Sequence, residues 1–377
     1  MVRVVVVIAI LAAFGGGIAA GALTDRGGNR STRLHLDLRV DRGRAAPFLR
    51  RFDLAALNTG AAPDQIRSID RPIFDTPAQA RALLPASSLV VGLARGGQAR
   101  AYPIDLLSLH EVVNDLVGGT PVAITWCPLC SSALAFDRHI RGRVLTFGIS
   151  GLLYHANQNL FDRQTRSLWS QLAGGAVTGR MRGTPLRPIP LVETTWGKWL
   201  HAHPHTLVLS IRRDSRAYDF THSHSFATHL GEEVSDQPYG NYTDKVSFYF
   251  GRRVRGIVDG SRVLGVIVRG QAKAYPVALL RRRRAIDDVV AHRPILLTYD
   301  DGALTGAAFS RGIRGRTLTF RPAGSELVDR QTGTRWSAAT GRGLSGPLAG
   351  VSLPRLPSTV PYWFAWRAFH PDTAVAR

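Results

Sequence analysis

One segment of the chain occurs twice, and the repetition around it constrains the fold more than any other feature. The segment GQARAYP at residues 97–103 returns as GQAKAYP at residues 270–276, an offset of 173 residues. After a difference in length of six residues, the segment DRQT at residues 162–165 returns at residues 329–332, an offset of 167. Long-period self-similarity indicates repeated structure. We therefore expect a β-rich α+β protein in which an internal duplication gives two similar lobes.

The repeat also suggests where the parts of the chain begin and end. Residues 63–210 are expected to form an N-terminal lobe and residues 263–377 a degenerate C-terminal lobe, joined by a linker at residues 211–262. We call these two lobes the first and second repeat. Residues 23–62 are rich in arginine, glycine and alanine, which predicts a loosely ordered lead-in with one strand at residues 34–40. The linker histidines, His222, His224 and His229, indicate a polar loop.

Residues 1–22 have the composition of a targeting segment. Arg3 precedes a wholly apolar stretch at residues 4–14, and small residues follow at 20–22, which is the order of parts in a secretory signal. The uncharged stretch at residues 4–23 is also long enough to span a bilayer as an uncleaved anchor. Both alternatives predict an extracytoplasmic protein, secreted or membrane-anchored.

The net charge of +21 comes almost entirely from arginine. Such a charge suits nucleic acid, anionic lipid or acidic envelope polymers. The arginines are scattered, however, and the one dense run, Arg281–Arg284, has no interleaved aromatic residues on which bases would stack. We expect no nucleic-acid binding. A membrane or an anionic envelope surface is the partner class that this basic surface leaves open, and the sequence indicates no protein partner.

Cys127 and Cys130, in the segment WCPLC, are the only cysteines. A bridge between them would close a very small loop and so stabilise the fold by much less than the ~3 kcal/mol of a 15-residue loop. Paired sulfurs at this spacing instead hold a metal or exchange disulfides. The second repeat has the turn signature Asp-Asp-Gly-Ala at residues 300–303. The cysteines are therefore expected in a turn between strands, as in zinc ribbons and rubredoxins, and not at a helix N-terminus as in thioredoxin.

Hydrophobic periodicity predicts the elements that surround this turn. A helix is expected at residues 104–117, because Leu106, Leu109, Val113 and Leu116 share one helical face. Content of β-branched and aromatic residues predicts strands at residues 89–94, 122–126, 133–138, 143–147 and 207–210. Two further helices are expected near residues 77–84 and 193–201.

The second repeat serves as a control for the first. Residues present in both repeats are expected to build the fold, and residues present in only one to carry the function. His110-Glu111 is replaced by Arg283-Arg284 in the second repeat. On the predicted helix, His110 borders the apolar face and is expected to point towards Cys127. Glu111 is expected to be a metal ligand, a base or an acceptor for an imidazole N–H, with a solvated surface position as the alternative.

The stretch at residues 148–159 is six residues longer than its counterpart. It is expected to be a polar loop that serves as a lid or supplies His155 as a ligand. Gln171, replaced by Ala338 in the second repeat, is expected to form hydrogen bonds in the same pocket. The predicted supporting residues of this pocket are Asn114, Ser150, Asn157 and Gln171.

Four motifs together resemble a known family. HEVVND at residues 110–115, WCPLC at 126–130, FGISGLLY at 147–154 and DRQTRSLWSQ at 162–171 are similar to the signature HExxND, [WY]CPLC, FGxSGLLY and DRxTxSLWxQ. That signature is typical of an uncharacterised prokaryotic domain family whose members are mostly exported. The resemblance runs from about residue 64 to the C-terminus and implies the domain without implying an activity.

Three hypotheses of function follow. The first is a metal centre for zinc, copper or iron, with the candidate ligands Cys127, Cys130, His110, His155 and Glu111. Four protein ligands would make it structural, whereas three would leave a position for chemistry or electron transfer. The second is an extracytoplasmic thiol–disulfide oxidoreductase, and the third a non-catalytic basic envelope-binding module. Whether the protein is an enzyme, and on what substrate, is not indicated.

Overall fold

The structure is a computed structural model that describes residues 35–40, 46–211, 260–300 and 305–377. The predicted targeting segment and almost all of the predicted linker, including His222, His224 and His229, lie outside these residues. Strands predominate over short helices, which confirms the β-rich α+β class. No helix in the described ranges is both long and apolar enough to cross a membrane.

The elements of the lead-in and the first repeat alternate short helices with antiparallel hairpins. In chain order they are η1 Pro47–Arg51, η2 Leu54–Ala56, β1 Leu57–Thr59, β2 Phe74–Asp75, α2 Pro77–Ala80, β3 Leu89–Arg95, β4 Gln98–Pro103, α3 Ile104–His110, β5 Val112–Val117, β6 Thr120–Cys127, η3 Pro128–Cys130, β7 Ser132–Asp137, β8 His139–Ile140, β9 Arg143–Val144, β10 Phe147–Tyr154, β11 Asn157–Asp162, β12 Leu168–Ser170, β13 Gly175–Ala176, β14 Arg187–Ile189, β15 Val192–Thr195, α4 Trp196–Ala202 and β16 Leu207–Leu209.

The second repeat contains a similar series of elements. They are β17 Val263–Val268, β18 Gln271–Pro276, α7 Val277–Arg283, β19 Ala285–Val290, β20 Arg293–Asp300, β21 Thr305–Ser310, β22 Gly312–Ile313, β23 Arg316–Thr317, β24 Phe320–Ala323, β25 Glu326–Asp329, β26 Arg335–Ser337, β27 Gly343–Ser345, β28 Ser358–Thr359, α8 Trp363–Phe369 and β29 Ala374–Val375.

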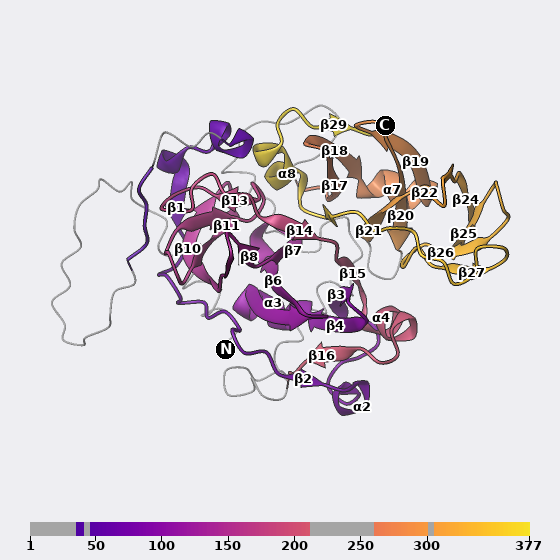
Figure 1. The fold of residues 1–377 in the computed structure, drawn as a ribbon, viewed down its shortest axis with the longest axis horizontal. Helices are drawn as coiled ribbons and strands as arrows, with labels where there is room; N and C mark the ends of the chain where they lie inside the picture. The colour runs from indigo at the N-terminus through magenta and orange to yellow at the C-terminus, as the bar shows by residue number, and fades with distance from the viewer. Residues whose placement is uncertain (1–34, 41–45, 212–259, 301–304) are drawn as a thin grey trace, which may run out of the picture.

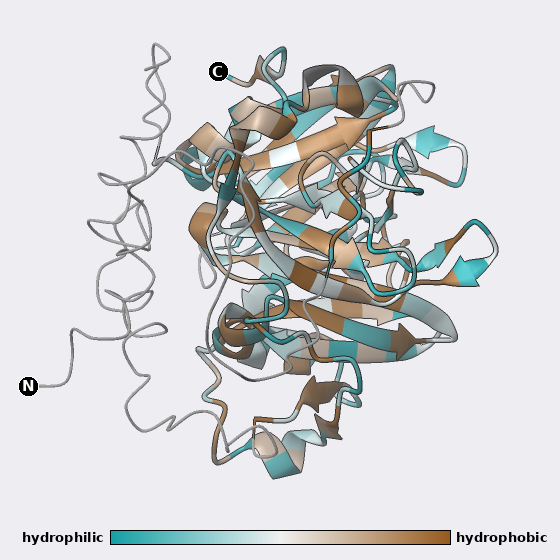
Figure 2. Cartoon of the chain, turned by 90° about the vertical axis from the view of Figure 1, so that its left-hand side faces the viewer, coloured by the Kyte–Doolittle hydropathy of each residue, from teal (hydrophilic) through white to brown (hydrophobic). Residues whose placement is uncertain are grey.

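The sheets of the two repeats have related strand orders. The order β15-β3-β4-β16-β2 corresponds to β28-β17-β18-β29. In the second sheet, β7-β6-β5 of the order β14-β7-β6-β5 correspond to β21-β20-β19. A third sheet, β1-β10-β11-β12-β13, corresponds to β24-β25-β26-β27. Figure 1 shows the first repeat in indigo to pink and the second in orange to yellow. Apolar residues concentrate along the strands of the sheets, whereas many hairpin tips are hydrophilic (Figure 2).

Residues shared by the two repeats make the same buried contacts. The Tyr102 hydroxyl donates to Asp115, and the Tyr275 hydroxyl donates to Asp288. The Trp169 indole N–H donates to Asp162, as does that of Trp336 to its Asp329. Because a buried polar group without a partner is costly, these matching bonds hold the turns and core in one arrangement. They support a structural role for the shared residues.

The predicted helix at residues 104–117 is wrong beyond His110. The chain turns at Glu111, whose φ of +54° is left-handed, and residues 112–117 form strand β5. The valines of this stretch fit a buried strand as well as a helical face, since β-branched side chains favour strands. Leu116, expected on the apolar helical face, is 57% exposed.

Four further predicted elements differ in extent, and the first, the helix expected near residues 77–84, ends at Ala80 as α2. Residues 143–147 are the short strand β9 and the start of β10, because the chain makes a tight hairpin with β8. Residues 192–195 form β15 beside β3, so the helix begins only at Trp196. Within residues 34–40 the structure shows one isolated bridge, between Asp37 and Ser167, and no strand in the described part.

The last helix of each repeat packs on a sheet of its own repeat. A Cβ atom at Gly92 would lie 2.4 Å from the Trp199 ring, and one at Gly265 would lie 2.3 Å from the Trp366 ring. Glycine at both positions therefore lets α4 approach β3 and α8 approach β17 closely.

The same two helices also contact the turn of the opposite repeat. The Tyr362 N–H, just before α8, donates to the Cys130 carbonyl oxygen at 3.0 Å. Lys198 of α4 forms an ion pair with Asp300, which occupies the position of Cys127 in the second repeat. The start of the last helix of each repeat therefore contacts the other repeat, at the cysteine turn in one case and at the end of β20 in the other.

Candidate functional site

The cysteine turn joins two neighbouring antiparallel strands. β6 ends at Cys127, η3 makes one 3₁₀ turn, and β7 begins at Ser132, which pairs with Cys127. Ser131 completes the reversal with a left-handed φ of +52°. The prediction that the pair lies between two strands is confirmed. Neither cysteine begins an α-helix, so the helix N-terminus that activates thioredoxin-type thiols is not present here.

Both cysteines are free thiols and are buried. Cys127 is 1% exposed and Cys130 is fully buried. They belong to an apolar cluster with Leu172 and with residues from the start of the second repeat's last helix, namely Tyr362, Phe364 and Ala365. A buried thiol is normally inert, because the apolar surroundings disfavour the thiolate. What these sulfurs can do therefore depends on the polar groups beside them.

Polar side chains converge on the Cys130 sulfur. The Asn157 side-chain amide donates to it at 3.1 Å, and the Ser132 hydroxyl lies 3.2 Å away. Both residues also bond to the Gln171 side-chain oxygen, at 2.7 Å from Asn157 and 2.9 Å from Ser132. All four side chains are buried. A serine hydroxyl has one proton, so Ser132 either donates to Gln171 and accepts from a Cys130 thiol, or turns to donate to a Cys130 thiolate.

Main-chain groups fix the direction of these amides. The Leu172 N–H donates to the Asn157 side-chain oxygen at 3.1 Å, so the Asn157 NH₂ group points at the sulfur. Gln171 donates through its own NH₂ group to Thr125 at 2.8 Å and to the Ser132 carbonyl at 3.2 Å. Its oxygen is thereby left as the acceptor for Asn157. The network is connected throughout, which preorganises donors around the sulfur.

The pKa values of the two thiols are shifted in opposite directions. Burial alone would raise the pKa of Cys130, but hydrogen bonds from Cys127, Ser132 and Asn157 outweigh it and lower that pKa below its usual value. Burial raises the pKa of Cys127 well above its usual value, with its hydrogen bond to Cys130 as the next cause. The Ala156 carbonyl oxygen, 3.6 Å from the Cys127 sulfur, is the alternative acceptor for its single proton. Cys130 is therefore the more acidic thiol of the pair, and Cys127 is the one that keeps its proton more strongly.

Glu111 follows the end of α3, close enough to the pair for its charge to interact with both cysteines. Its N–H donates to the Leu107 carbonyl, and its carbonyl oxygen accepts from the Trp126 N–H at 2.8 Å. No residue in the described part of the chain donates a hydrogen bond to its carboxyl group. Burial, followed by repulsion from Cys127, raises the pKa of Glu111 to about 8. A carboxyl group in such surroundings exchanges protons near neutral pH.

The structure places His110, the predicted third ligand, in different surroundings. Because the helix ends at this residue, the ring faces the segment that precedes β2 at the start of the first repeat, where Nδ1 lies 2.6 Å from the Arg67 carbonyl oxygen. A carbonyl oxygen accepts only, so Nδ1 carries a proton and donates. That nitrogen is therefore engaged with the main chain.

The stretch containing His155 is not the polar lid that was predicted. It forms the hairpin of β10 and β11, and the two-residue turn has positive φ at both His155 and Ala156. This is the φ combination of the tight hairpin turn that matches strand twist. The His155 ring packs against Tyr154 and Phe369, at centroid distances of 4.3 and 6.2 Å. The longer hairpin nonetheless delivers Asn157 to the sulfur.

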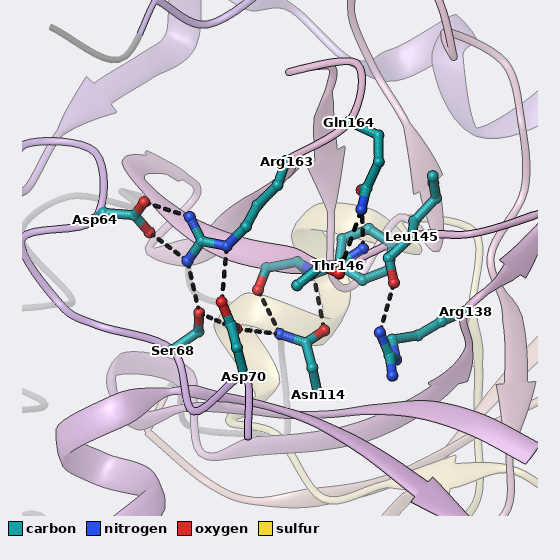
Figure 3. A network of polar contacts seen from close by, with 10 residues as sticks. Asp64, Ser68, Asp70, Asn114, Arg138, Leu145, Thr146, Arg163 and Gln164 are labelled. Atoms are coloured by element: carbon teal, nitrogen blue, oxygen red, sulfur yellow. Dashed lines mark hydrogen bonds and ion pairs between the residues drawn. The ribbon is translucent and has the colours of Figure 1, made fainter. Parts of the chain in front are cut away.

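Two of the predicted supporting residues serve other parts of the fold. The Asn114 side chain bonds to Asp70 and to both backbone polar groups of Phe147, within the network that Arg163 forms with Asp64 and Asp70 (Figure 3). Ser150 donates to the Asn159 carbonyl and accepts from the Leu152 N–H, on the irregular part of β10. Neither residue has a hydrogen bond to a cysteine.

The geometry does not assemble the predicted ligand set. Within the described ranges, no three His, Cys, Asp or Glu side chains come together as a group that could hold a metal ion. What the fold brings together is the cysteine pair, Glu111, Asn157 and Gln171. The second repeat has Asp300 and Ala303 for the cysteines, Arg284 for Glu111 and Ala338 for Gln171, and its shorter hairpin lacks Asn157.

Sequence reasoning missed three contributors to this site. Ser132 and Thr125 complete the network of Gln171, and their position beside the cysteines in strands β6 and β7 was a usable signal. Tyr362 covers the turn from the second repeat, 232 positions after Cys130. No local pattern points to that contact.

Comparison with known proteins identifies a family but no function. The model of a family described as "Protein of unknown function (DUF3179)" matches residues 63–373. No curated protein matches the chain, and no solved structure does.

Proposed function

Because the chain belongs to this family of proteins of unknown function, its activity has to be argued from its own site, and we propose that Cys127 and Cys130 form a buried redox dithiol. In this proposal the pair cycles between two thiols and an intramolecular disulfide, and Glu111 exchanges the proton of Cys127. The first repeat carries the chemistry, and the second repeat supports and covers it.

The observation that carries the proposal is the convergence of donors on one sulfur of the pair. Asn157 and Ser132 both reach Cys130, and Gln171 holds them in place. A structural cysteine in an apolar core needs no such donors, whereas a thiolate does, because a hydrogen bond to a charged group stabilises that form. The polar network is therefore explained by a thiolate.

Cys127 and Glu111 suit the proton transfer that disulfide formation requires. Formation of the disulfide joins the two sulfurs and releases two electrons and the protons still bound to the thiols. The proton of Cys127 has to leave a buried position, and the Glu111 carboxylate is the group beside it that can accept one. Reduction reverses each transfer.

A redox titration tests the proposal. The purified protein would be equilibrated with mixtures of reduced and oxidised dithiothreitol, and its free thiols and mass measured after alkylation. We expect one two-electron transition, with a Cys127–Cys130 disulfide in the oxidised protein, that is absent from Cys127→Ser and Cys130→Ser. If the thiols stay reduced under all conditions, or if substitution of both changes nothing beyond local stability, the redox proposal is wrong and a non-catalytic module is favoured.

A soft metal ion on the same two sulfurs is the second candidate function. The adjacency of Cys127 and Cys130 favours it, since thiolate pairs select ions such as Cu(I). Two sulfurs with Glu111 do not make the closed four-ligand set of structural zinc. Elemental analysis of protein prepared without a metal-affinity tag would separate the candidates. Stoichiometric metal that disappears in the double serine variant would favour this function over thiol redox chemistry.

We further propose how the molecule came to have this form and where it acts. The matching order of elements and the matching buried contacts support an internal duplication after which the second repeat lost its site. The composition of residues 1–22 supports export, with the body outside the cytoplasm. The exposed arginines of α7, such as Arg281 and Arg282, support attraction to an anionic envelope surface and not to nucleic acid.

A further inference from the structure

We propose that the oxidant of the Cys127–Cys130 dithiol is a small peroxide and not the disulfide of another protein. This inference rests on the proposed redox function and names the substrate class of the same site. It is carried by the burial of both sulfurs, by the donors around Cys130 and by the unpartnered carboxyl group of Glu111.

Burial of the sulfurs decides against a macromolecular disulfide. In thiol–disulfide exchange the attacking sulfur, the attacked sulfur and the leaving sulfur must meet, so the rate depends on access to the thiol. Cys127 and Cys130 are at most 1% exposed, and Tyr362, Phe364 and Ala365 of the second repeat cover them. A protein disulfide could reach them only if the two repeats separated at this contact. A peroxide needs room for two oxygen atoms and a small substituent.

The polar groups around Cys130 suit the oxygen atoms of a peroxide. Asn157 and Ser132 both lie within hydrogen-bond distance of the sulfur, and their side chains can donate to oxygen as well as to sulfur. Charge develops on the leaving oxygen during attack, and donors that are already fixed stabilise it without reorganisation. Gln171 and Leu172 hold Asn157 in that orientation.

The reaction balances with the residues present. The Cys130 thiolate attacks the terminal oxygen of ROOH, the O–O bond breaks, and the Glu111 carboxyl group protonates the leaving RO⁻ to ROH. Cys130 is now a sulfenic acid. Cys127 then gives its proton to the Glu111 carboxylate and attacks the Cys130 sulfur, which forms the disulfide and expels hydroxide, released as water with a proton from solvent. The sulfur pair is oxidised by two electrons and the peroxide is reduced by two.

A comparison of the rates at which different oxidants react with the protein tests the inference. Reduced protein would be mixed separately with hydrogen peroxide, tert-butyl hydroperoxide and an aromatic disulfide, dithiobis(nitrobenzoate), and the loss of free thiol followed with time. We expect peroxide to convert the pair to the disulfide faster than the aromatic disulfide reacts, and Cys127→Ser to retain a sulfenic acid on Cys130 that dimedone traps. Faster reaction with the aromatic disulfide would overturn the peroxide assignment and leave the redox dithiol intact. Failure of every oxidant to form the disulfide would overturn both.

Variants of the acid and its counterpart sharpen the test. Glu111→Gln keeps the size of the side chain but cannot supply a proton, so peroxide consumption should slow by ~10²-fold, the usual contribution of a general acid. Arg284→Gln, at the equivalent position of the second repeat, should react as the wild type does. Asn157→Ala provides a second variant and should also slow the peroxide reaction. Wild-type rates in both Glu111→Gln and Asn157→Ala would contradict the inference.

Discussion

Cys127, at the end of β6, and Asp300, at the end of β20, occupy equivalent positions in the two repeats but carry different side chains. In the first repeat the residue at the end of the strand is Cys127, within a network that ends on Cys130. In the second it is Asp300, which is 8% exposed in its side chain and accepts from Thr194 and Lys198 of the other repeat. The comparison shows that this position is buried against the opposite repeat in either case. The fold buries this position, and the side chain decides whether it forms an ion pair or carries a thiol.

The residues that follow α3 and α7 likewise share a backbone conformation and differ in their side chains. Glu111 and Arg284 both have a positive φ, and their carbonyl oxygens accept from the N–H groups of Trp126 and Tyr299. The side chains differ: Glu111 is half-buried near Cys127, whereas the Arg284 guanidinium lies 5.7 Å above the Tyr299 ring. Because the backbone strain is common to both repeats, it belongs to the turn and not to catalysis.

The largest expected effect on stability tests whether equivalent buried residues stabilise the two repeats equally. Trp169→Ala and Trp336→Ala each remove a fully buried ring whose indole N–H bonds to an aspartate. Each should lower the free energy of unfolding by about 3–5 kcal/mol, as large aromatic-to-alanine substitutions in cores do. Denaturant unfolding of both variants would measure it. Effects that differ widely between the two would break the equivalence of the repeats.

The pH dependence of stability should distinguish Glu111 from Arg284. The pKa of Glu111 in the folded protein, about 8, lies above its usual 4.5, so the folded state binds more protons between these values. Stability is then lost as pH rises through this window, by at most about 1.4 kcal/mol per pH unit.

Urea unfolding between pH 5 and 8 would compare Glu111→Gln and Arg284→Gln with the wild type. Glu111→Gln should lose less stability with rising pH than the wild type, and Arg284→Gln should follow the wild type. The buried Glu193, whose pKa is raised to about 7 by burial, is present in all three proteins and cancels in the comparison. Parallel pH profiles for Glu111→Gln and the wild type would contradict the assignment.

The contact across the repeats at Asp300 should have a smaller effect. Lys198→Met removes the cation that faces this buried carboxylate and leaves Thr194 as its partner. Since the lysine side chain is 46% exposed, we expect a loss of about 1–2 kcal/mol, less than for a fully buried pair. Lys198→Arg keeps the charge and should lose less. Thermal unfolding would measure the loss of stability in both variants. Equal losses in Lys198→Met and Lys198→Arg would show that packing of the lysine side chain, and not its charge, provides the stabilisation.

The smallest expected effect concerns the acidity of Cys130. Asn157→Ala removes one donor to its sulfur and should raise its pKa by about one unit, the equivalent of one hydrogen bond to a charged group. Asn159→Ala is the matched control, because that residue is equally buried on the same strand but donates to the Leu152 carbonyl. Thiolate absorbance against pH would measure the shift. Equal shifts in both variants would mean that the strand, not the donor, controls the thiol.

Local patterns predicted the parts of the fold that depend on neighbouring residues. The strands around the cysteines follow from their β-branched and aromatic residues, and the turn from the Asp-Gly signature of the second repeat. The helix prediction failed after His110, because Val112 and Val113 suit a strand as well as a helical face. Only the hydrogen bonds of the neighbouring strand β6 select β5. The predicted direction of the His110 side chain rested on that longer helix, whereas in the structure its ring contacts the Arg67 carbonyl oxygen.

The sequence by itself determined which residues are particular to the first repeat, among them Cys127, Cys130, Glu111 and Gln171. This was possible because the residues of the two repeats can be compared from the sequence, with the second repeat as an internal control. Only the tertiary structure decided which of those residues meet. Hairpin pairing brings Asn157 to the sulfur, the start of α8 in the other repeat packs on the cysteines, and the end of α3 places the His110 ring against the Arg67 carbonyl oxygen. These contacts join positions far apart in the chain, and their energies depend on burial and direction, which sequence spacing does not contain.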